Sequence, residues 1–175
     1  MDQLIEQVKQ LAELIGPNIY LQALVIAVAF IAVGKIADWI VSRAIGKLVS
    51  RSKNDVDDRV VDLLHRPIFL SFVLLGLSLA TQRIELPGPP EFITLGALKT
   101  IAVIIWYNML RQLTDLLVET AGRNRTSKIV QSGMLVLIQN VIKVALFALV
   151  VYFIFLAWDI NVTAWVASAG IVGLA

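Results

Sequence analysis

The chain has 175 residues, of which 58% are hydrophobic and 16% charged, and its mean hydropathy is +0.82. Soluble domains carry about 25% charged residues, so this composition predicts an integral membrane protein. The sequence has no cysteine, which excludes disulfides and thiol chemistry, and its one histidine, His65, cannot form a histidine cluster. We therefore expect no enzyme, no catalytic residue, no metal and no cofactor. A net charge of +2 is too small to indicate a nucleic-acid partner.

Residues 1–17 are predicted to form an amphipathic segment. An apolar stripe at helical spacing ends at Gly16-Pro17. The acidic start lacks the basic first region of a signal peptide. The pattern fits a helix lying flat on a membrane and, equally, a soluble leader helix.

Four apolar stretches follow that are predicted to cross the membrane, at residues 18–41, 67–81, 92–110 and 134–157. The second is shorter than the ~20 residues that a bilayer requires, so we expect the amphipathic turns before it to complete the crossing. Pro67 suits the first turn of that span. The proline-rich segment 83–91 predicts a turn that no helix can pass through.

Two basic connectors, 43–66 and 111–133, join the spans in pairs, so residues 18–157 are interpreted as two helical hairpins. The connectors carry six and four Lys and Arg residues, and the flanking segments outside the spans carry two. The positive-inside rule therefore predicts cytoplasmic connectors and an external N-terminus. Asn54-Asp55 and Asp57-Asp58 are expected to cap a helix that continues through Leu64. The basic residues expected to couple to lipid headgroups are Arg43, Lys47, Arg51, Arg59, Arg123, Arg125 and Lys128.

Four charged residues fall inside the predicted spans. Lys35 and Asp38 are three residues apart, close enough on a helix to pair, and both lie near the end of their span. Lys99 lies inside the third span. Lys143 is expected to reach the headgroups at the start of the fourth. Buried charges in a span are also functional candidates.

Residues 161–175 are small or apolar and carry no charge. Ala167, Ile171 and Ala175 recur every fourth residue, so they share one helix face, and Gly170 and Gly173 lie on a neighbouring face. Small residues let helices approach backbone to backbone in lipid. The pattern fits a contact within one bundle or a symmetric ring of such helices around a pore.

Residues 167–175, ASAGIVGLA, resemble the start of the pore-lining helix in the small-conductance mechanosensitive channel family, and 158–163 resemble the turn that precedes it. Asp57-Asp58-Arg59 is also similar to that family's connectors. The resemblance implies that Leu174 is the first of two constricting leucines. It implies that Ala167 and Ala175 pack against Gly170 and Gly173 of the next subunit. Ile171 departs from the family pattern, which has a small residue there.

The resemblance implies an all-α membrane protein with five transmembrane helices. The last would line the pore, and residues 158–175 would be the start of that helix, cut short. The first four would be a lipid-facing sensor. It also implies seven identical subunits in a bacterial inner membrane, opened by tension and passing ions and small osmolytes on hypo-osmotic shock. Residues 161–175 span only about 22 Å of a core about 30 Å thick, so we expect a longer protein whose cytoplasmic domain is absent from this chain.

Two other functions remain open from the residues alone. In a secondary transporter, Lys35, Asp38, Lys99 and Lys143 would line a substrate path. A structural membrane subunit would use the same helices only to assemble with partners.

Overall fold

The computed structural model describes residues 18–49, 55–123 and 132–163, together with Ala167, Gly170 and Gly173. Four long helices fill most of these ranges: α2 (Ile19–Val49), α3 (Asp55–Ile84), α4 (Pro89–Arg123) and α5 (Ser132–Ala157). The described ranges contain no strand, so the all-α prediction is confirmed for them. Each helix is long and apolar enough to cross a membrane, over Ile19–Val41, Arg59–Ile84, Pro89–Thr120 and Met134–Ala157. The fifth span stays a prediction, because most of its residues lie outside the described ones.

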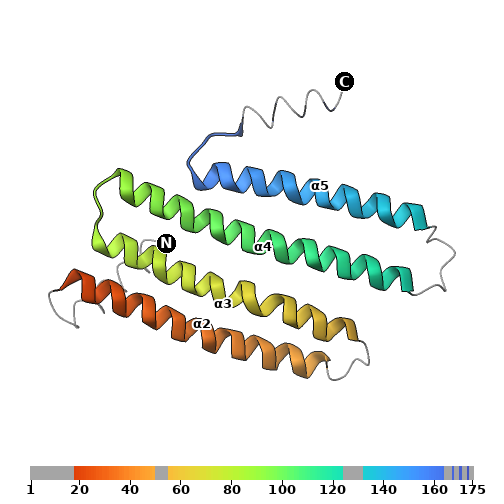
Figure 1. The fold of residues 1–175 in the computed structure, drawn as a ribbon, viewed down its shortest axis with the longest axis horizontal. Helices are drawn as coiled ribbons and strands as arrows, with labels where there is room; N and C mark the ends of the chain where they lie inside the picture. The colour runs from red at the N-terminus through yellow and green to blue at the C-terminus, as the bar shows by residue number, and fades with distance from the viewer. Residues whose placement is uncertain are drawn as a thin grey trace.

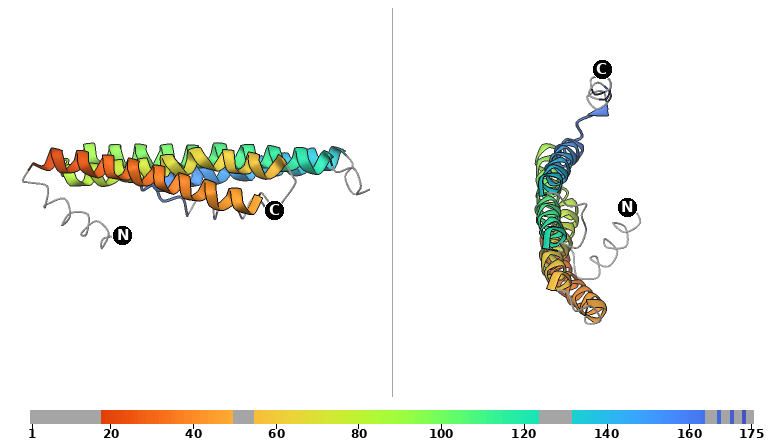
Figure 2. Two further views of the ribbon diagram at one scale, coloured as in Figure 1. Left: turned by 90° about the horizontal axis from the view of Figure 1, so that it is seen from below. Right: turned by 90° about the vertical axis from the view of Figure 1, so that its right-hand side faces the viewer.

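The four helices lie side by side and antiparallel in a single layer, in chain order (Figure 1). Contacts join α2 to α3, α3 to α4 and α4 to α5. Seen edge-on, the layer is thin and curved (Figure 2). We call the edge that carries the α3–α4 turn at 85–88 the turn end, and the opposite edge, at Val49, Asp55, Arg123 and Ser132, the connector end.

Local chemistry explains where the helices begin at the turn end. The Asn18 side chain accepts a hydrogen bond from the backbone N–H of Tyr20 at 3.1 Å and so caps α2. The predicted proline-rich turn is confirmed: α3 ends at Ile84 and α4 begins at Pro89. Proline suits that position because the first helical N–H groups have no intrahelical partner.

One expectation about the second span is wrong. Pro67 does not start a helix, because α3 begins at Asp55 and passes through it. The 67–81 stretch is too short to cross alone, and the turns before it extend the apolar span back to Arg59. The hydroxyl of Ser71 donates to the Pro67 carbonyl at 2.7 Å, within the turn that follows the proline. The described residues of the connectors 43–66 and 111–133 are helical, since α2 reaches Val49 and α4 reaches Arg123. The helix expected to continue through Leu64 is part of α3.

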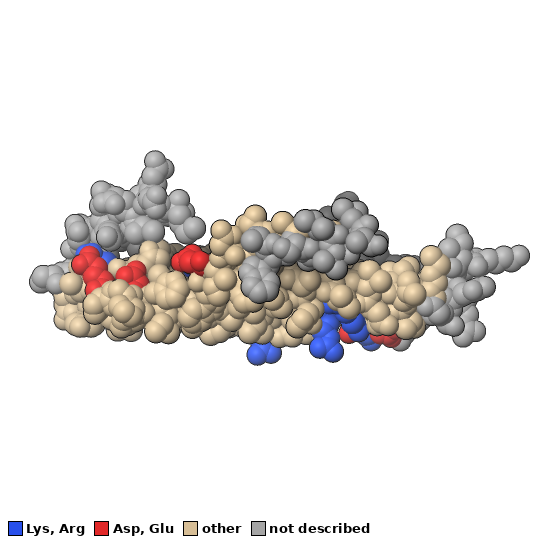
Figure 3. All heavy atoms as spheres, turned by 90° about the horizontal axis from the view of Figure 1, so that it is seen from above, with Lys and Arg blue, Asp and Glu red and all other residues tan. Residues whose placement is uncertain are grey.

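A single layer has almost no interior. The buried apolar side chains are few and mostly small, and no large side chain among the described residues is fully buried. Large apolar side chains face outward instead, as at Val144, which is 69% exposed, and Leu137, which is 64% exposed. In Figure 3, residues other than Lys, Arg, Asp and Glu cover most of the surface that the described residues present. Apolar surface of this extent is compatible with a membrane, where lipid tails replace water as the solvent.

The α2–α3 pair is held by two reciprocal contacts between phenylalanine and glycine. Phe30 and Gly34 are one turn apart on α2, and Phe72 and Gly76 are one turn apart on α3. A Cβ atom placed on Gly76 would overlap the Cβ of Phe30, and one on Gly34 would lie 3.1 Å from the Cβ of Phe72. Because the helices are antiparallel, the same four-residue spacing on each lets both phenylalanines meet a glycine. Glycine at these positions therefore sets how closely the two backbones approach.

We predict that Gly76→Ala destabilises the protein although alanine is the better helix former. The added methyl would force α2 and α3 apart, at an expected cost of about 1–3 kcal/mol. Helix propensity alone favours alanine by about 1 kcal/mol, the opposite sign. Unfolding in mixed detergent micelles, followed by circular dichroism, measures the difference.

Gly34→Ala is the graded control for this prediction. Its methyl would meet Phe72 at 3.1 Å, a tight contact that a small shift relieves, so its cost should be smaller. A Gly76→Ala variant as stable as the wild-type protein would show that close α2–α3 packing does not limit stability.

Candidate functional site

The layer ends in a sharply terminated helix followed by the start of another. At the end of α5, the N–H of Ile160 donates to the carbonyl of Phe155 at 2.9 Å, and the N–H of Asp159 donates to that of Leu156 at 3.2 Å. Asp159 has a φ of 53°, the left-handed conformation. This pattern is a Schellman motif, which satisfies the last helical carbonyls and stops the helix. Aspartate is among the few residues other than glycine that tolerate the left-handed position.

Asn161 starts the next helix. Its side-chain oxygen accepts a hydrogen bond from the N–H of Thr163 at 3.0 Å, the geometry of an N-terminal cap. Thr163, Ala167, Gly170 and Gly173 are helical. Residues 158–163 therefore form an elbow with defined hydrogen bonds, in the place where the resemblance expects the turn into a pore helix.

The predicted pore-lining residues are only partly described. Ala167, Gly170 and Gly173 are helical and exposed. A Cβ atom added to Gly170 or Gly173 would meet no other atom within 4 Å. Leu174, Ile171 and Ala175 lie outside the described residues, so the proposed constriction stays a prediction.

The Trp158 side chain docks onto α4. Its indole N–H donates to the hydroxyl of Thr100 at 3.0 Å. Its ring packs over Gly96, where a Cβ atom would lie 3.3 Å from the ring carbons. The Phe92 ring meets the indole edge to face, with 5.9 Å between centroids and 79° between planes. Phe92, Gly96 and Thr100 are four residues apart, so one stripe of α4 forms the whole docking surface.

A second polar contact joins α4 and α5 toward the connector end. Asp115 on α4 accepts a hydrogen bond from the Gln139 amide at 2.6 Å, and the Lys143 ammonium lies 2.7 Å from the same oxygen. The sequence predicts a headgroup contact for Lys143, and the structure gives this lysine a carboxylate partner on the neighbouring helix. Asp115 was missed because nothing in its local sequence indicates which helix it faces.

An apolar groove of about 300 Å³ lies between these two polar contacts. Its walls come from α4 and α5 and include Trp106, Tyr107, Leu146 and Phe153. Polar contacts thus join α4 and α5 at the turn end and near the middle of α5, and the apolar groove lies between them.

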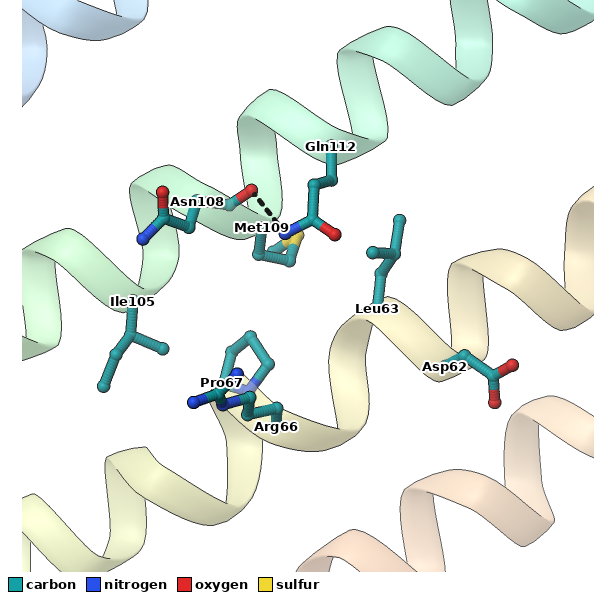
Figure 4. A pocket seen from close by; sticks show the side chains of 8 residues that line it. All are labelled: Asp62, Leu63, Arg66, Pro67, Ile105, Asn108, Met109 and Gln112. Carbon is teal, nitrogen blue, oxygen red and sulfur yellow. Dashed lines mark hydrogen bonds between the residues drawn. The ribbon is translucent and has the colours of Figure 1, made fainter.

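A polar groove lies between α3 and α4 nearer the connector end (Figure 4). One hollow of about 250 Å³ is lined by residues that include Arg66, Pro67, Asn108 and Met109. A more open hollow of about 420 Å³ adjoins it through shared residues and adds Arg59. Pro67 and Met109 are buried, whereas Arg66 and Asn108 are exposed. The groove therefore has an apolar floor and a charged rim, a combination that suits the headgroup region of a membrane.

The predicted lipid-coupling residues are dispersed. The Arg43 guanidinium lies 3.8 Å from the Trp39 ring centroid on the exposed side of α2, an arrangement that stacks a cation on an aromatic face. Arg59 lines the polar groove. Lys47 and Arg123 fall within α2 and α4, but their side chains are outside the described part. Arg51, Arg125 and Lys128 lie outside the described residues altogether.

The remaining charged side chains of the spans show two further arrangements. Asp38 on α2 lies 2.6 Å from Nδ1 of His65 on α3, a contact that bridges the two helices. Lys35 and Lys99 are exposed. Within the described ranges, no group of three or more His, Asp or Glu side chains has the proximity to hold a metal.

Comparisons with known protein families, with curated proteins and with solved structures found no match to this chain. Its function is therefore inferred from its own residues and contacts.

We predict that Asp115 and Lys143 stabilise the α4–α5 pair together. Lys143→Met leaves a carboxylate at a lipid-exposed helix pair without its counter-charge, so it should destabilise the protein more than it does in the Asp115→Asn background. Interhelical polar contacts in membranes give coupling energies of about 0.5–1.5 kcal/mol. A double-mutant cycle on the unfolding free energy in micelles measures this coupling.

Lys99→Met is the matched control. Lys99 is also a lysine of the layer, but it lies about 24 Å from Asp115 along α4. Its effect should add to that of Asp115→Asn. If the effect of Lys143→Met on the unfolding free energy also simply added to that of Asp115→Asn, the coupling between the two residues would be contradicted.

Proposed function

We propose that this chain is the transmembrane region of an ion channel opened by membrane tension, in which the helix after Asn161 lines the pore. The observation that carries the proposal is the pair Gly170 and Gly173. Each glycine costs a helix about 1 kcal/mol relative to alanine. A Cβ atom added to either glycine would meet no atom within 4 Å beyond its own stretch of helix backbone. Close approach of the same helix from a neighbouring subunit would use the open space.

The helix layer suits the part of a tension sensor. It exposes many large apolar side chains, and its helices contact mainly their chain neighbours, so lipid would surround most of it. Tension favours whichever state occupies more membrane area, and it acts only through the difference between the states. The thin, curved layer, at the periphery of a ring, would be the element that undergoes such a change (Figure 2).

Orientation and assembly follow from charge and resemblance. The excess of Lys and Arg in 43–66 and 111–133 supports a cytoplasmic connector end. The polar groove and Arg59 would then face inner-leaflet headgroups. By resemblance the assembly has seven subunits in a bacterial inner membrane and passes ions and small osmolytes, with membrane lipids as its other partners.

Patch-clamp recording of the full-length protein in liposomes tests the proposal, and Leu174→Ser tests the gate. Current that rises steeply with suction supports a tension-gated channel. A leucine ring blocks ions by excluding water, so a serine at that level should leave a measurable current without applied tension. Substrate-coupled flux that ignores suction would favour a transporter instead. A variant as tight as the wild type would remove Leu174 from the gate.

Gly173 is predicted to set contact between neighbouring pore helices. Gly173→Val adds a branched side chain in the space that the next subunit would occupy, so it should raise the opening tension or prevent assembly. Gly173→Ala should do the same to a lesser degree. Native mass spectrometry reports assembly and patch recording reports the threshold. Normal assembly and a normal threshold in the valine variant would count against the contact.

A further inference from the structure

We propose that Trp158 is a latch that holds the start of the C-terminal helix to α4, and that displacement of α4 reaches that helix through this contact. The part of this inference that concerns channel opening rests on the proposed function. Its structural half, the docking of Trp158, stands on contacts within the described residues.

The latch is a chain of hydrogen bonds with a defined direction. The indole N–H of Trp158 donates to Oγ1 of Thr100 at 3.0 Å. The same hydroxyl donates to the backbone carbonyl of Gly96, one turn earlier on α4, at 2.8 Å. Because the threonine proton is committed to that carbonyl, an oxygen lone pair remains for the indole. The orientation of the tryptophan is therefore tied to the backbone of α4.

Packing reinforces this hydrogen-bond chain. The indole lies over Gly96, so closely that a methyl group there would be 3.3 Å from three ring carbons. Phe92 closes one side of the indole in an edge-to-face contact. Aromatic pairs of this geometry contribute beyond the area that they bury. The ring is held by three positions on one face of one helix.

Trp158 lies just before the C-terminal helix, so its contact with α4 can affect the position of that helix. It is the last residue before the left-handed Asp159, and Asn161 caps the following helix two residues later. Val162 is 7% exposed, whereas the described residues after it, Thr163, Ala167, Gly170 and Gly173, are all exposed. Among the described residues, burial against the layer is therefore found at the elbow, at Val162. A shift of α4 would move the elbow, and the elbow is the root of the proposed pore helix.

The experiment removes the hydrogen bond while keeping the ring and the fold. Trp158→Phe lacks the donor, and Thr100→Val lacks the acceptor with little change in shape. Thr100→Ser keeps the hydroxyl and should behave as the wild type. The matched control pair is Trp106→Phe with Ser71→Ala, which removes the other indole-to-hydroxyl bond, also 3.0 Å long, between α3 and α4.

Two measurements are made on each variant in lipid nanodiscs or liposomes. Hydrogen–deuterium exchange reports whether residues 158–163 stay docked, without any need for current. Patch recording reports the ratio of open to closed channels at fixed tension. We expect both Trp158→Phe and Thr100→Val to speed exchange at 158–163 and to lower that ratio about fivefold, the scale of one net hydrogen bond. The double variant should be no worse than either single one, since both remove the same bond.

The outcomes separate the latch from the channel proposal. If the wild type shows no tension-gated current, the channel and the coupling both fail, while exchange still reports whether Trp158 docks. If the wild type gates and the two single variants speed exchange without changing the open ratio, the contact is only structural and the latch is overturned. Additive effects of the two variants, or an equal change of the open ratio in the control pair, would also overturn it.

Discussion

The constraint behind this structure is the absence of a core. A single layer of four helices packs each helix mainly against its chain neighbours, so no helix is buried on all sides. In lipid, apolar side chains gain little by leaving the solvent, because the solvent is itself apolar. Cohesion must then come from close backbone approach and from hydrogen bonds between helices. Both occur in the layer: Gly76 admits Phe30 in the middle of the α2–α3 pair, and Thr100 receives the Trp158 indole at the turn end of the α4–α5 pair.

The three helix pairs meet this constraint to different degrees. The α2–α3 pair has reciprocal phenylalanine–glycine contacts in its middle, and polar contacts toward both ends: Arg83 donates to Gln22 at 2.7 Å, and Asp38 meets His65. The α4–α5 pair is pinned by Trp158 and Asp115, with an apolar groove between them. The α3–α4 pair has the polar groove along its connector half. The α2–α3 contacts are thus spread along the pair, whereas each of the other two pairs leaves a groove between its helices.

Sequence reasoning predicted the spans well where a charge or a cap bounds an apolar run. The first and fourth spans were expected at 18–41 and 134–157 and are found at Ile19–Val41 and Met134–Ala157. It failed at Pro67, because local preference cannot show that a helix already formed upstream will continue through a proline. It could not find the partners of Phe30, Asp115 or Trp158, because each depends on the register between two helices. The sequence does show glycine four residues from phenylalanine on two helices. That spacing indicates a close helix contact but does not identify the helix that makes it. The constricting role of Leu174 stays a prediction drawn from resemblance.

At the elbow, the Trp158 contact with α4 and the Asn161 cap can transmit movement together, whereas neither could do so alone. A latch on a flexible linker would transmit nothing, since the linker would absorb any movement of α4. Here the Schellman motif at Asp159 and the cap at Asn161 fix the backbone on both sides of Ile160. Aspartate in the left-handed conformation tolerates that position at some cost, and the two backbone hydrogen bonds offset it. A stiff elbow turns a displacement of α4 into a displacement of the helix that follows. The chain thus places a helix-stopping motif and a helix cap side by side between the α4–α5 pair and the helix that begins after Asn161.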